Sequence, residues 1–265
     1  MSGSIEGVVA VTGGASGIGA ACCRELAARG ARVAVLDRSE TARGIAHEVG
    51  GLAFLVDVSD EASVARCVQA VEAECGPVEV LVNNAGVIQV PVPPEQLSMN
   101  DWDEVVRVDQ RGAYLVARAF GMRMVARRRG SIVNIASIAG MRSMPLHAYA
   151  PAKAAIISMT ECLAAEWGPS GVRVNAVSPG HTITPALQAA VDKGERDLAL
   201  LERCTALGRL VRPEDVARAV AFLGGSEAGA ITGVNLPVDC GWLVAASWQG
   251  YGGLRDAPTV DASER

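Results

Sequence analysis

Residues 8–19 read VVAVTGGASGIG, and this stretch determines which fold the rest of the chain is expected to adopt. A short apolar run at 8–11 is typical of a buried strand, a glycine turn follows, and a helical pattern continues to residue 29. This arrangement brings backbone N–H groups and the positive end of the helix dipole together, which favours a bound phosphate. Because the glycines at 13, 17 and 19 depart from G-x-G-x-x-G spacing, a plain glycine-rich turn is the alternative.

Six more apolar runs follow the first, at residues 33–36, 53–56, 80–82, 132–135, 172–177 and 234–238. Further helical patterns lie among them, at residues 61–75, 102–127, 148–167 and 213–223. Strands that alternate with helices of this length form right-handed βαβ units. No composition break, low-complexity linker or internal repeat interrupts the alternation. The sequence therefore predicts one α/β domain over residues 1–265, with a doubly wound, seven-stranded parallel sheet flanked by helices.

The composition excludes several classes of protein. The 265 residues are 50% hydrophobic and 4% aromatic, which suits buried parallel strands under closely packed helices. The net charge of -5 gives no electrostatic footprint for nucleic acid or for an anionic membrane. No uncharged apolar run reaches the roughly 18 residues of a membrane span, and the N-terminus does not resemble a signal peptide. We therefore expect a soluble cytoplasmic protein. The 7 cysteines show no metal-ligand spacing, so we expect them to be reduced thiols and expect no metal site.

Tyr149 and Lys153 are the first candidates for chemistry. They stand four residues apart in a helical pattern, so they share one helix face. A fixed ammonium favours phenolate over phenol and would lower the tyrosine pKa from about 10 toward working pH, which suits a general acid or base. Ser137, just after the apolar run 132–135, could hold a substrate oxygen nearby. Taken alone, the Tyr-x-x-x-Lys pair is weak evidence and is more typical of a solvated surface pair.

Asp37 ends the second apolar run and predicts the cofactor. A carboxylate at the end of the second strand can accept both hydrogen bonds from an adenosine ribose diol, and it repels a 2′-phosphate. The sequence therefore favours NAD over NADP, although Arg38 could soften that repulsion.

Taken together, the motifs resemble the short-chain dehydrogenase/reductase family, of the NAD-dependent type. They occur in the family's order between about residues 7 and 242: Thr12-Gly13-x-x-x-Gly17-x-Gly19, Asp57-Val58, Asn83-Asn84-Ala85-Gly86, Ser137, Tyr149-x-x-x-Lys153, Asn175, Pro179-Gly180 and Thr184. The resemblance implies a single-domain Rossmann fold and an enzyme that acts on CH–OH groups. It also implies a homotetramer, built as a dimer of dimers around the helices at 102–127 and 148–167.

The resemblance implies a role for each matching residue. Gly13, Gly17 and Gly19 would cradle the pyrophosphate, and Thr184 would hold the nicotinamide carboxamide. The catalytic residues would be Ser137, Tyr149, Lys153 and Asp109. The residues that would bind NAD are Gly13, Ser16, Gly17, Ile18, Gly19, Asp37, Asp57, Val58, Asn84, Ala85, Gly86, Tyr149, Lys153, Pro179, Gly180, Thr182 and Thr184.

Asp109 departs from the family pattern. The family usually has V-N-x-x-G at this point, where this chain has Val108-Asp109-Gln110-Arg111-Gly112. The asparagine is thought to hold a water that links the lysine to bulk solvent. An ionised aspartate accepts hydrogen bonds but cannot donate them; it could still anchor that water and would stabilise the Lys153 cation. A second departure is Cys240, which stands where the family usually has glycine.

Substrate contacts are expected from the segments that vary most within the family. These are a loop at about residues 183–209 and a C-terminal tail at about residues 242–265. Trp242, Trp248 and Tyr251 lie close together in the tail, which should pack over its own active site or a neighbouring one. His147 and His181 would border the substrate, or stand in loops without a chemical role.

The leading functional hypothesis is an NAD-dependent oxidoreductase that interconverts a secondary alcohol and a ketone. Tyr149 would exchange the hydroxyl proton, Lys153 would tune it and bind the nicotinamide ribose, and Ser137 would orient the oxygen. Segments 118–121, 124–127 and 163–167 resemble bacterial polyol and sugar dehydrogenases. A ketoreductase of 3-oxoacyl thioesters is the alternative within enzymes, and a non-catalytic NAD-binding sensor or scaffold is the alternative outside them.

Overall fold

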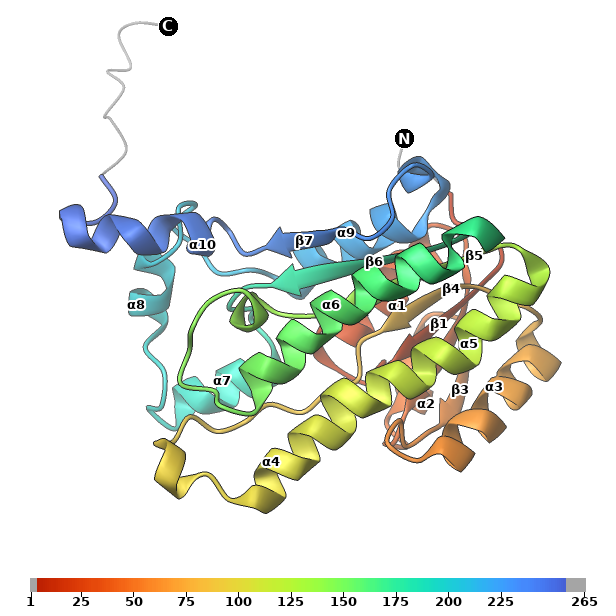
Figure 1. The fold of residues 1–265 in the computed structure, drawn as a ribbon, viewed down its shortest axis with the longest axis horizontal. Helices are drawn as coiled ribbons and strands as arrows, with labels where there is room; N and C mark the ends of the chain where they lie inside the picture. Colours follow the sequence, from red (N-terminus) through yellow and green to blue (C-terminus); the bar gives the residue numbers. More distant parts are fainter. Residues whose placement is uncertain (1–3, 256–265) are drawn as a thin grey trace, which may run out of the picture.

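The fold is built on a seven-stranded parallel sheet in the order β3-β2-β1-β4-β5-β6-β7 (Figure 1). The computed structural model describes residues 4–255. The strands are β1 (Val8–Thr12), β2 (Arg32–Asp37), β3 (Leu52–Leu55), β4 (Val78–Asn83), β5 (Gly130–Ile135), β6 (Val172–Pro179) and β7 (Asn235–Val238). Each strand coincides with one of the seven apolar runs, and every neighbouring pair is parallel. The predicted doubly wound Rossmann fold is confirmed.

Helices cover both faces of this sheet. The bounds are α1 (Gly17–Ala28), α2 (Ala42–Glu48), α3 (Glu61–Cys75), α4 (Met99–Val105), α5 (Ala113–Arg127), α6 (Tyr149–Trp167), α7 (Pro185–Asp192), α8 (Leu198–Arg203), α9 (Pro213–Gly224) and α10 (Trp242–Ala245). None of the helices within residues 4–255 is long and apolar enough to cross a membrane.

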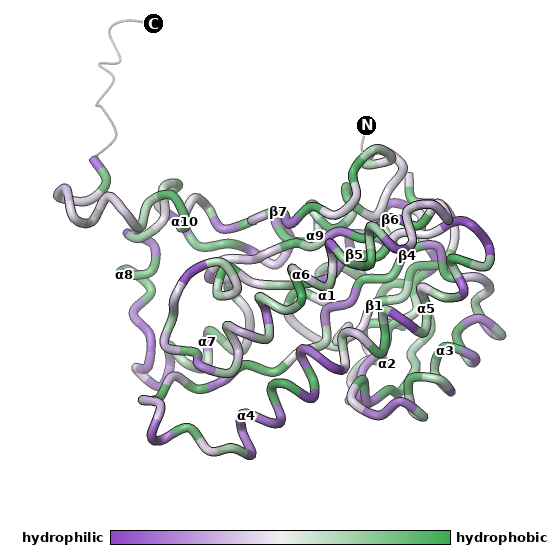
Figure 2. Tube along the Cα trace, in the orientation of Figure 1, coloured by the Kyte–Doolittle hydropathy of each residue, from purple (hydrophilic) through white to green (hydrophobic). Residues whose placement is uncertain are grey.

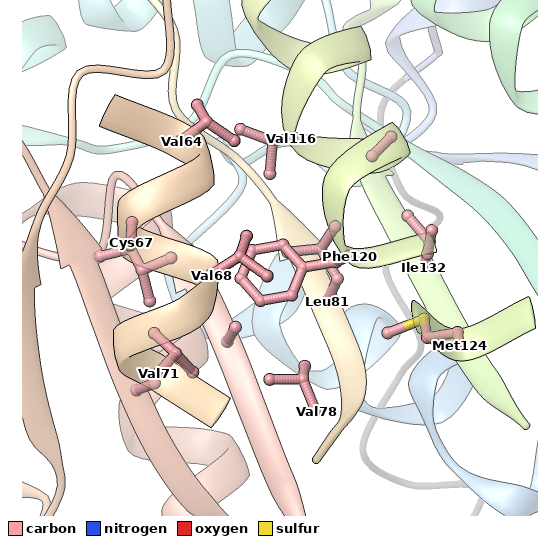
Figure 3. Packing of buried hydrophobic residues seen from close by; sticks show 14 of the residues in the cluster. Val64, Cys67, Val68, Val71, Val78, Leu81, Val116, Phe120, Met124 and Ile132 are labelled. Atoms are coloured by element: carbon pink, nitrogen blue, oxygen red, sulfur yellow. The ribbon is translucent and has the colours of Figure 1, made fainter. Parts of the chain in front are cut away.

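The sheet has a separate hydrophobic core on each face because successive strand residues point to opposite sides. On the face shared with α3 and α5, Leu81 and Ile132 pack against Phe120 and Val68 (Figure 3). The other face packs against α1 and α9 through a second set of valines and leucines. Along α3 and α4 the trace alternates between hydrophilic and hydrophobic residues, as expected for helices with one face in solvent (Figure 2).

The helical pattern at residues 102–127 is a prediction that the structure corrects. The helix begins at Met99 as α4, passes through a π-helical turn at Val106–Gly112, and continues as α5. A π turn widens the helix by one residue, and a hydrophobic period read over many turns cannot register one extra residue. The π turn carries Asp109, whose side chain is fully buried. Turns of this kind are frequent at functional sites.

The β1 and β4 strands lie side by side at the point where the strand order reverses. In open α/β sheets, ligands bind in the crevice at the carboxyl ends of the strands at such a point. β1 ends at Thr12, directly before the glycine turn, and β4 ends at Asn83, directly before Asn84-Ala85-Gly86. The fold therefore brings the two predicted cofactor motifs together.

The two segments expected to contact substrate lie toward one end of the molecule (Figure 1). Residues 183–209 contain α7 and α8, two helices that the sequence did not predict. The tail contains α10 and a 3-10 helix at Ala246–Tyr251. Trp248 is 46% exposed and Tyr251 92% exposed, so residues 4–255 cover about half of Trp248 and very little of Tyr251. The end of the predicted tail, 256–265, lies outside the described residues.

Candidate active site

The glycine turn is fastened to the end of β4. Asn84 donates from its side-chain amide to the carbonyl oxygens of Thr12 (2.9 Å) and Gly13 (3.2 Å). The Thr12 hydroxyl accepts from the backbone N–H of Asn84 at 2.9 Å. A β-carbon on Gly19 would stand 2.0 Å from the Gly13 carbonyl oxygen, so no other residue fits there. The turn is thus a closely packed stretch of backbone fastened to β4, and its glycines leave room for a pyrophosphate to approach the backbone.

The N-terminus of α1 opens onto this turn. Its N-cap residue, Ser16, is exposed and its side chain makes no capping hydrogen bond, and the first turn of the helix carries no acidic residue. Uncapped N–H groups at the positive end of a helix favour an anion. Gly17, in the left-handed region at φ 52°, lies opposite Thr184, since a β-carbon on it would meet the Thr184 methyl at 3.5 Å. The substrate loop therefore begins beside the phosphate turn.

Asp37 lies beside the same turn. Its carboxylate accepts from the backbone N–H of Ala15 at 3.0 Å and from that of Ser39 at 2.9 Å. Each carboxylate oxygen can accept a second hydrogen bond, so both can still receive a ribose hydroxyl. These contacts hold the negative charge at the end of β2, where an adenosine 2′-phosphate would meet it. The neighbouring Arg38 is exposed.

Asp57 and Val58 occupy different environments. Asp57 accepts from the N–H of Ser59 (2.9 Å) and from its hydroxyl (2.6 Å), and these bonds, from hydroxyl and then backbone, hold its carboxyl pKa below the usual value. Val58 is 7% exposed and its side chain belongs to the core beneath α5. Any contact of Val58 with an adenine would therefore come mainly from its backbone.

Pro179, Gly180 and Thr182 form the rim beyond β6. Gly180 packs against the backbone of Asp239, where a β-carbon would come within 2.8 Å. The Thr182 hydroxyl donates to the Gly180 carbonyl oxygen at 2.9 Å, so it supports the turn. His181 packs edge-on against Trp242, with 5.8 Å between ring centroids. Burial, and after it the charge of Arg196, lowers the pKa of His181, which keeps this ring neutral at pH 7.

Tyr149 and Lys153 lie on one face of α6, as predicted. The Lys153 ammonium stands 5.3 Å from the centroid of the Tyr149 ring. It also donates to the carbonyl oxygen of Ile135 at the end of β5, at 3.2 Å. Ser137 follows two residues later, half-buried, with its hydroxyl accepting from the N–H of Ala139 at 3.1 Å. The end of β5 thus places Ser137 directly before the 3-10 turn at Ile138–Gly140, which packs against α6.

Asp109 contacts Lys153 directly. Its Oδ2 lies 3.1 Å from the Lys153 ammonium, and the two side chains are 0% and 5% exposed. Oδ2 makes no other contact of this kind among the described residues, so its partner is the Lys153 ammonium, in a buried ion pair. Oδ1 accepts from the N–H of Val87 at 2.7 Å. A β-carbon on Gly86 would stand 2.9 Å from Oδ2, so glycine there makes room for the carboxylate.

The pKa of Lys153 reflects its surroundings. Burial is the largest influence and lowers the pKa, but the charges of Asp109 and Tyr149 together outweigh it, so the pKa lies above its usual value. Lys153 is therefore a permanent cation at working pH. An ammonium held charged at the tyrosine is what phenolate chemistry requires.

One buried polar residue beside this site was not predicted. Gln89 lies on the segment after Gly86 and is 5% exposed. Its carbonyl oxygen accepts from the N–H of Ala148 at 2.7 Å and from that of Tyr149 at 3.3 Å. The sequence gives no sign of this burial, because a lone glutamine between Ile88 and Val90 is typical of an exposed loop residue.

Known proteins that are similar to this chain include named dehydrogenases, and one similar crystal structure is described as an isomerase. The family model described as Enoyl-(Acyl carrier protein) reductase matches residues 13–243. D-threitol dehydrogenase of Mycolicibacterium smegmatis is 39% identical, over 91% of this chain and 94% of that protein. A crystal structure described as ribose-5-phosphate isomerase from Brucella melitensis 16M is 52% identical, with TM-score 0.95, over 97% of this chain and all of that one. NAD+-bound xylitol dehydrogenase is 31% identical, with TM-score 0.83, over 89% and 98% of the two chains.

A dinucleotide cradle at the sheet crevice together with a Tyr-x-x-x-Lys helix defines an NAD(P)-binding oxidoreductase. The chain belongs to the short-chain dehydrogenase/reductase family. Two further solved relatives have bound NADP, so both cofactors occur among similar chains.

Proposed function

We propose that this protein is an NAD-dependent dehydrogenase that interconverts a secondary alcohol of the polyol type and the corresponding ketone. The observation that carries the proposal is the Lys153 ammonium, buried and 5.3 Å from the centroid of the Tyr149 ring, beside the dinucleotide cradle. Relatives that act on threitol and xylitol by name support the polyol class.

In this proposal the protein's residues transfer the proton and orient the substrate. When bound, the nicotinamide supplies or accepts the hydride. Tyr149 takes the hydroxyl proton in oxidation and returns it in reduction, and Lys153 stabilises the phenolate. The Ser137 hydroxyl donates to the substrate oxygen and sets its position. Asp109 keeps Lys153 charged.

Three other functions fit the site less well. A 3-oxoacyl thioester ketoreductase would more often use NADPH, which Asp37 and the uncharged Ala15 disfavour. An aldose–ketose isomerase moves hydrogen within one sugar, so it would leave the glycine turn and Asp37 without a purpose. A non-catalytic sensor would not need Ser137, Tyr149 and Lys153 together.

The test of this function is an assay of four- to six-carbon polyols, simple secondary alcohols and 3-oxoacyl thioesters with both cofactors. We expect oxidation of at least one polyol, with kcat/KM for NAD at least about tenfold above that for NADP, because Asp37 repels the 2′-phosphate. Asp37→Ala should narrow this ratio and the nearby Glu40→Ala should not. An NADP advantage in the parent, or conversion of ribose 5-phosphate without a cofactor, would contradict the proposal.

A second prediction concerns the charge of Asp109. Its carboxylate opposes the phenolate of Tyr149, since like charges disfavour each other. Asp109→Asn should therefore keep activity and move the alkaline rise of kcat for alcohol oxidation toward lower pH. The measurement is the pH profile of kcat, with the exposed Asp103→Asn as the matched control. A profile identical to that of the parent would place Asp109 outside the proton path.

We also propose a homotetramer in the cytoplasm. All 7 cysteines are free, which suits a reducing compartment.

The proposed subunit interface involves α5. Tyr114 and Met122 of α5 are 44% and 55% exposed. A groove of about 360 Å³ between the π turn and α6 is lined by Tyr114, Ile156 and Met159, among others. An apolar surface of this kind suits a second copy of the chain.

A further inference from the structure

We propose that Gln89 is a positioning residue that caps the catalytic helix from outside and fixes Tyr149 without adding charge; this inference rests on the proposed function. α6 begins at Tyr149, and its N-cap residue, Ala148, has no side chain able to accept a hydrogen bond. Unpaired N–H groups at a helix start need an acceptor from elsewhere. Gln89 is that acceptor, from a segment about 60 residues away in sequence.

The burial pattern shows that the position of Gln89 is specific. The two flanking side chains, Ile88 and Val90, are 66% and 67% exposed, while the glutamine between them is 5% exposed. This inverts the usual preference, in which apolar side chains are buried and amides are exposed. Two backbone N–H groups require the carbonyl oxygen to face α6, so the orientation of the amide is determined.

The same segment also holds Asp109, the partner of Lys153. Two residues before Gln89, the N–H of Val87 binds Asp109, which in turn pairs with Lys153. Asn84 of this segment fastens the glycine turn. Residues 84–89 therefore tie the cofactor turn, the lysine and the tyrosine to one piece of backbone. A displacement of about 1 Å at such a site can cost on the order of 100-fold in rate.

The choice of glutamine over glutamate has a chemical reason. A carboxylate would be the stronger cap, because negative charge at a helix N-terminus is favoured. Gln89 instead keeps a neutral amide whose Nε2 is buried and makes no hydrogen bond to residues 4–255, which costs stability. A neutral cap adds no negative charge beside Tyr149, and a negative charge there would oppose the phenolate.

Within residues 4–255, two charged groups are placed at Tyr149 or at its partner lysine by a direct contact. Lys153 is on its own helix and Asp109 is on the π turn packed against it. His147 precedes it by two residues and is half-buried, and Arg142 follows the 3-10 turn at Ile138–Gly140 and is exposed. A carboxylate added at residue 89 would therefore change the charge near Tyr149 and should raise the pKa of its hydroxyl.

Two variants separate capping from charge. In Gln89→Leu, kcat should fall about 10- to 100-fold while the dissociation constant for NAD changes less than about threefold. Hydrogen exchange at the amides of Ala148 and Tyr149 should accelerate. In Gln89→Glu, the same amides should stay protected and kcat at the optimum should recover to within about fivefold of the parent. Its alkaline rise should move up by about 1 pH unit, because the carboxylate disfavours the phenolate.

The control is Gln69→Leu, the same change on the exposed face of α3. Unchanged exchange and kcat in Gln89→Leu would overturn the proposal. An equal loss of kcat in both Gln89 variants, with the pH profile of the parent, would also overturn it. Gln89 would then contribute only packing. If the parent turns over no substrate, the proposed function fails, and exchange at Ala148 and Tyr149 still decides whether Gln89 is the cap.

Discussion

Tyr149→Phe is expected to lower kcat by about 100-fold to 10,000-fold, because it removes the hydroxyl that we propose exchanges the substrate proton beside Lys153. The phenyl ring keeps its place on α6, and the cofactor turn is fastened separately through Thr12 and Asn84. The dissociation constant for NAD should therefore change less than about threefold. The measurements are kcat by steady-state assay and NAD affinity by calorimetry.

Ser226→Ala is the control, since it also removes one hydroxyl, from an exposed residue in the 3-10 turn after α9. It should behave as the parent in both measurements. If Tyr149→Phe kept activity within a few-fold of the parent, the proton would have to pass through another group. The mechanism proposed for Ser137, Tyr149 and Lys153 would then be wrong.

The sheet could be predicted from the sequence because each strand is a continuous apolar run. Strands buried on both faces need no polar side, so the runs at residues 80–82 and 132–135 are distinct even without an alignment. The Tyr149 and Lys153 pair was predictable for a similar reason, because a spacing of four always places two residues on one helix face.

The contacts between distant segments could not be predicted in this way. The direct approach of Asp109 to Lys153 depends on a one-residue widening of the helix, and on a glycine at 86 that leaves space. Gln89 binds backbone N–H groups, which every residue except proline has and no sequence pattern marks. The α7 and α8 helices have 8 and 6 residues and no buried side chain, so they span too few turns to define a helical period in the sequence. Backbone chemistry is visible in a sequence where a residue type marks it, as the glycines at 13, 17 and 19 do, whereas a long-range contact to an unmarked backbone N–H is not.

Replacing one partner of the Asp109 and Lys153 pair is expected to destabilise the fold strongly. Among the described residues, Asp109→Leu leaves the buried ammonium hydrogen-bonded only to the Ile135 carbonyl oxygen, and Lys153→Met leaves the buried carboxylate hydrogen-bonded only to the Val87 N–H. Each change should lower the free energy of unfolding by about 3–5 kcal/mol, as is usual when a buried charge loses its partner. At roughly 2–4 °C per kcal/mol, Tm should fall by about 10 °C.

The double variant Asp109→Leu/Lys153→Met removes both charges and should recover most of this loss, because an apolar pair of similar volume is often as stable as a buried ion pair. Since the folded pKa of Lys153 lies above its unfolded value, the stabilisation is fully present at pH 7 and is lost only as pH rises through the folded pKa. Thermal unfolding at pH 7 is therefore the right measurement. Glu48→Gln, which breaks the exposed pair with Arg24, is the control and should leave Tm unchanged. Additive losses in the double variant would show that Asp109 and Lys153 stabilise the fold separately, and that the carboxylate is not what keeps the catalytic ammonium charged.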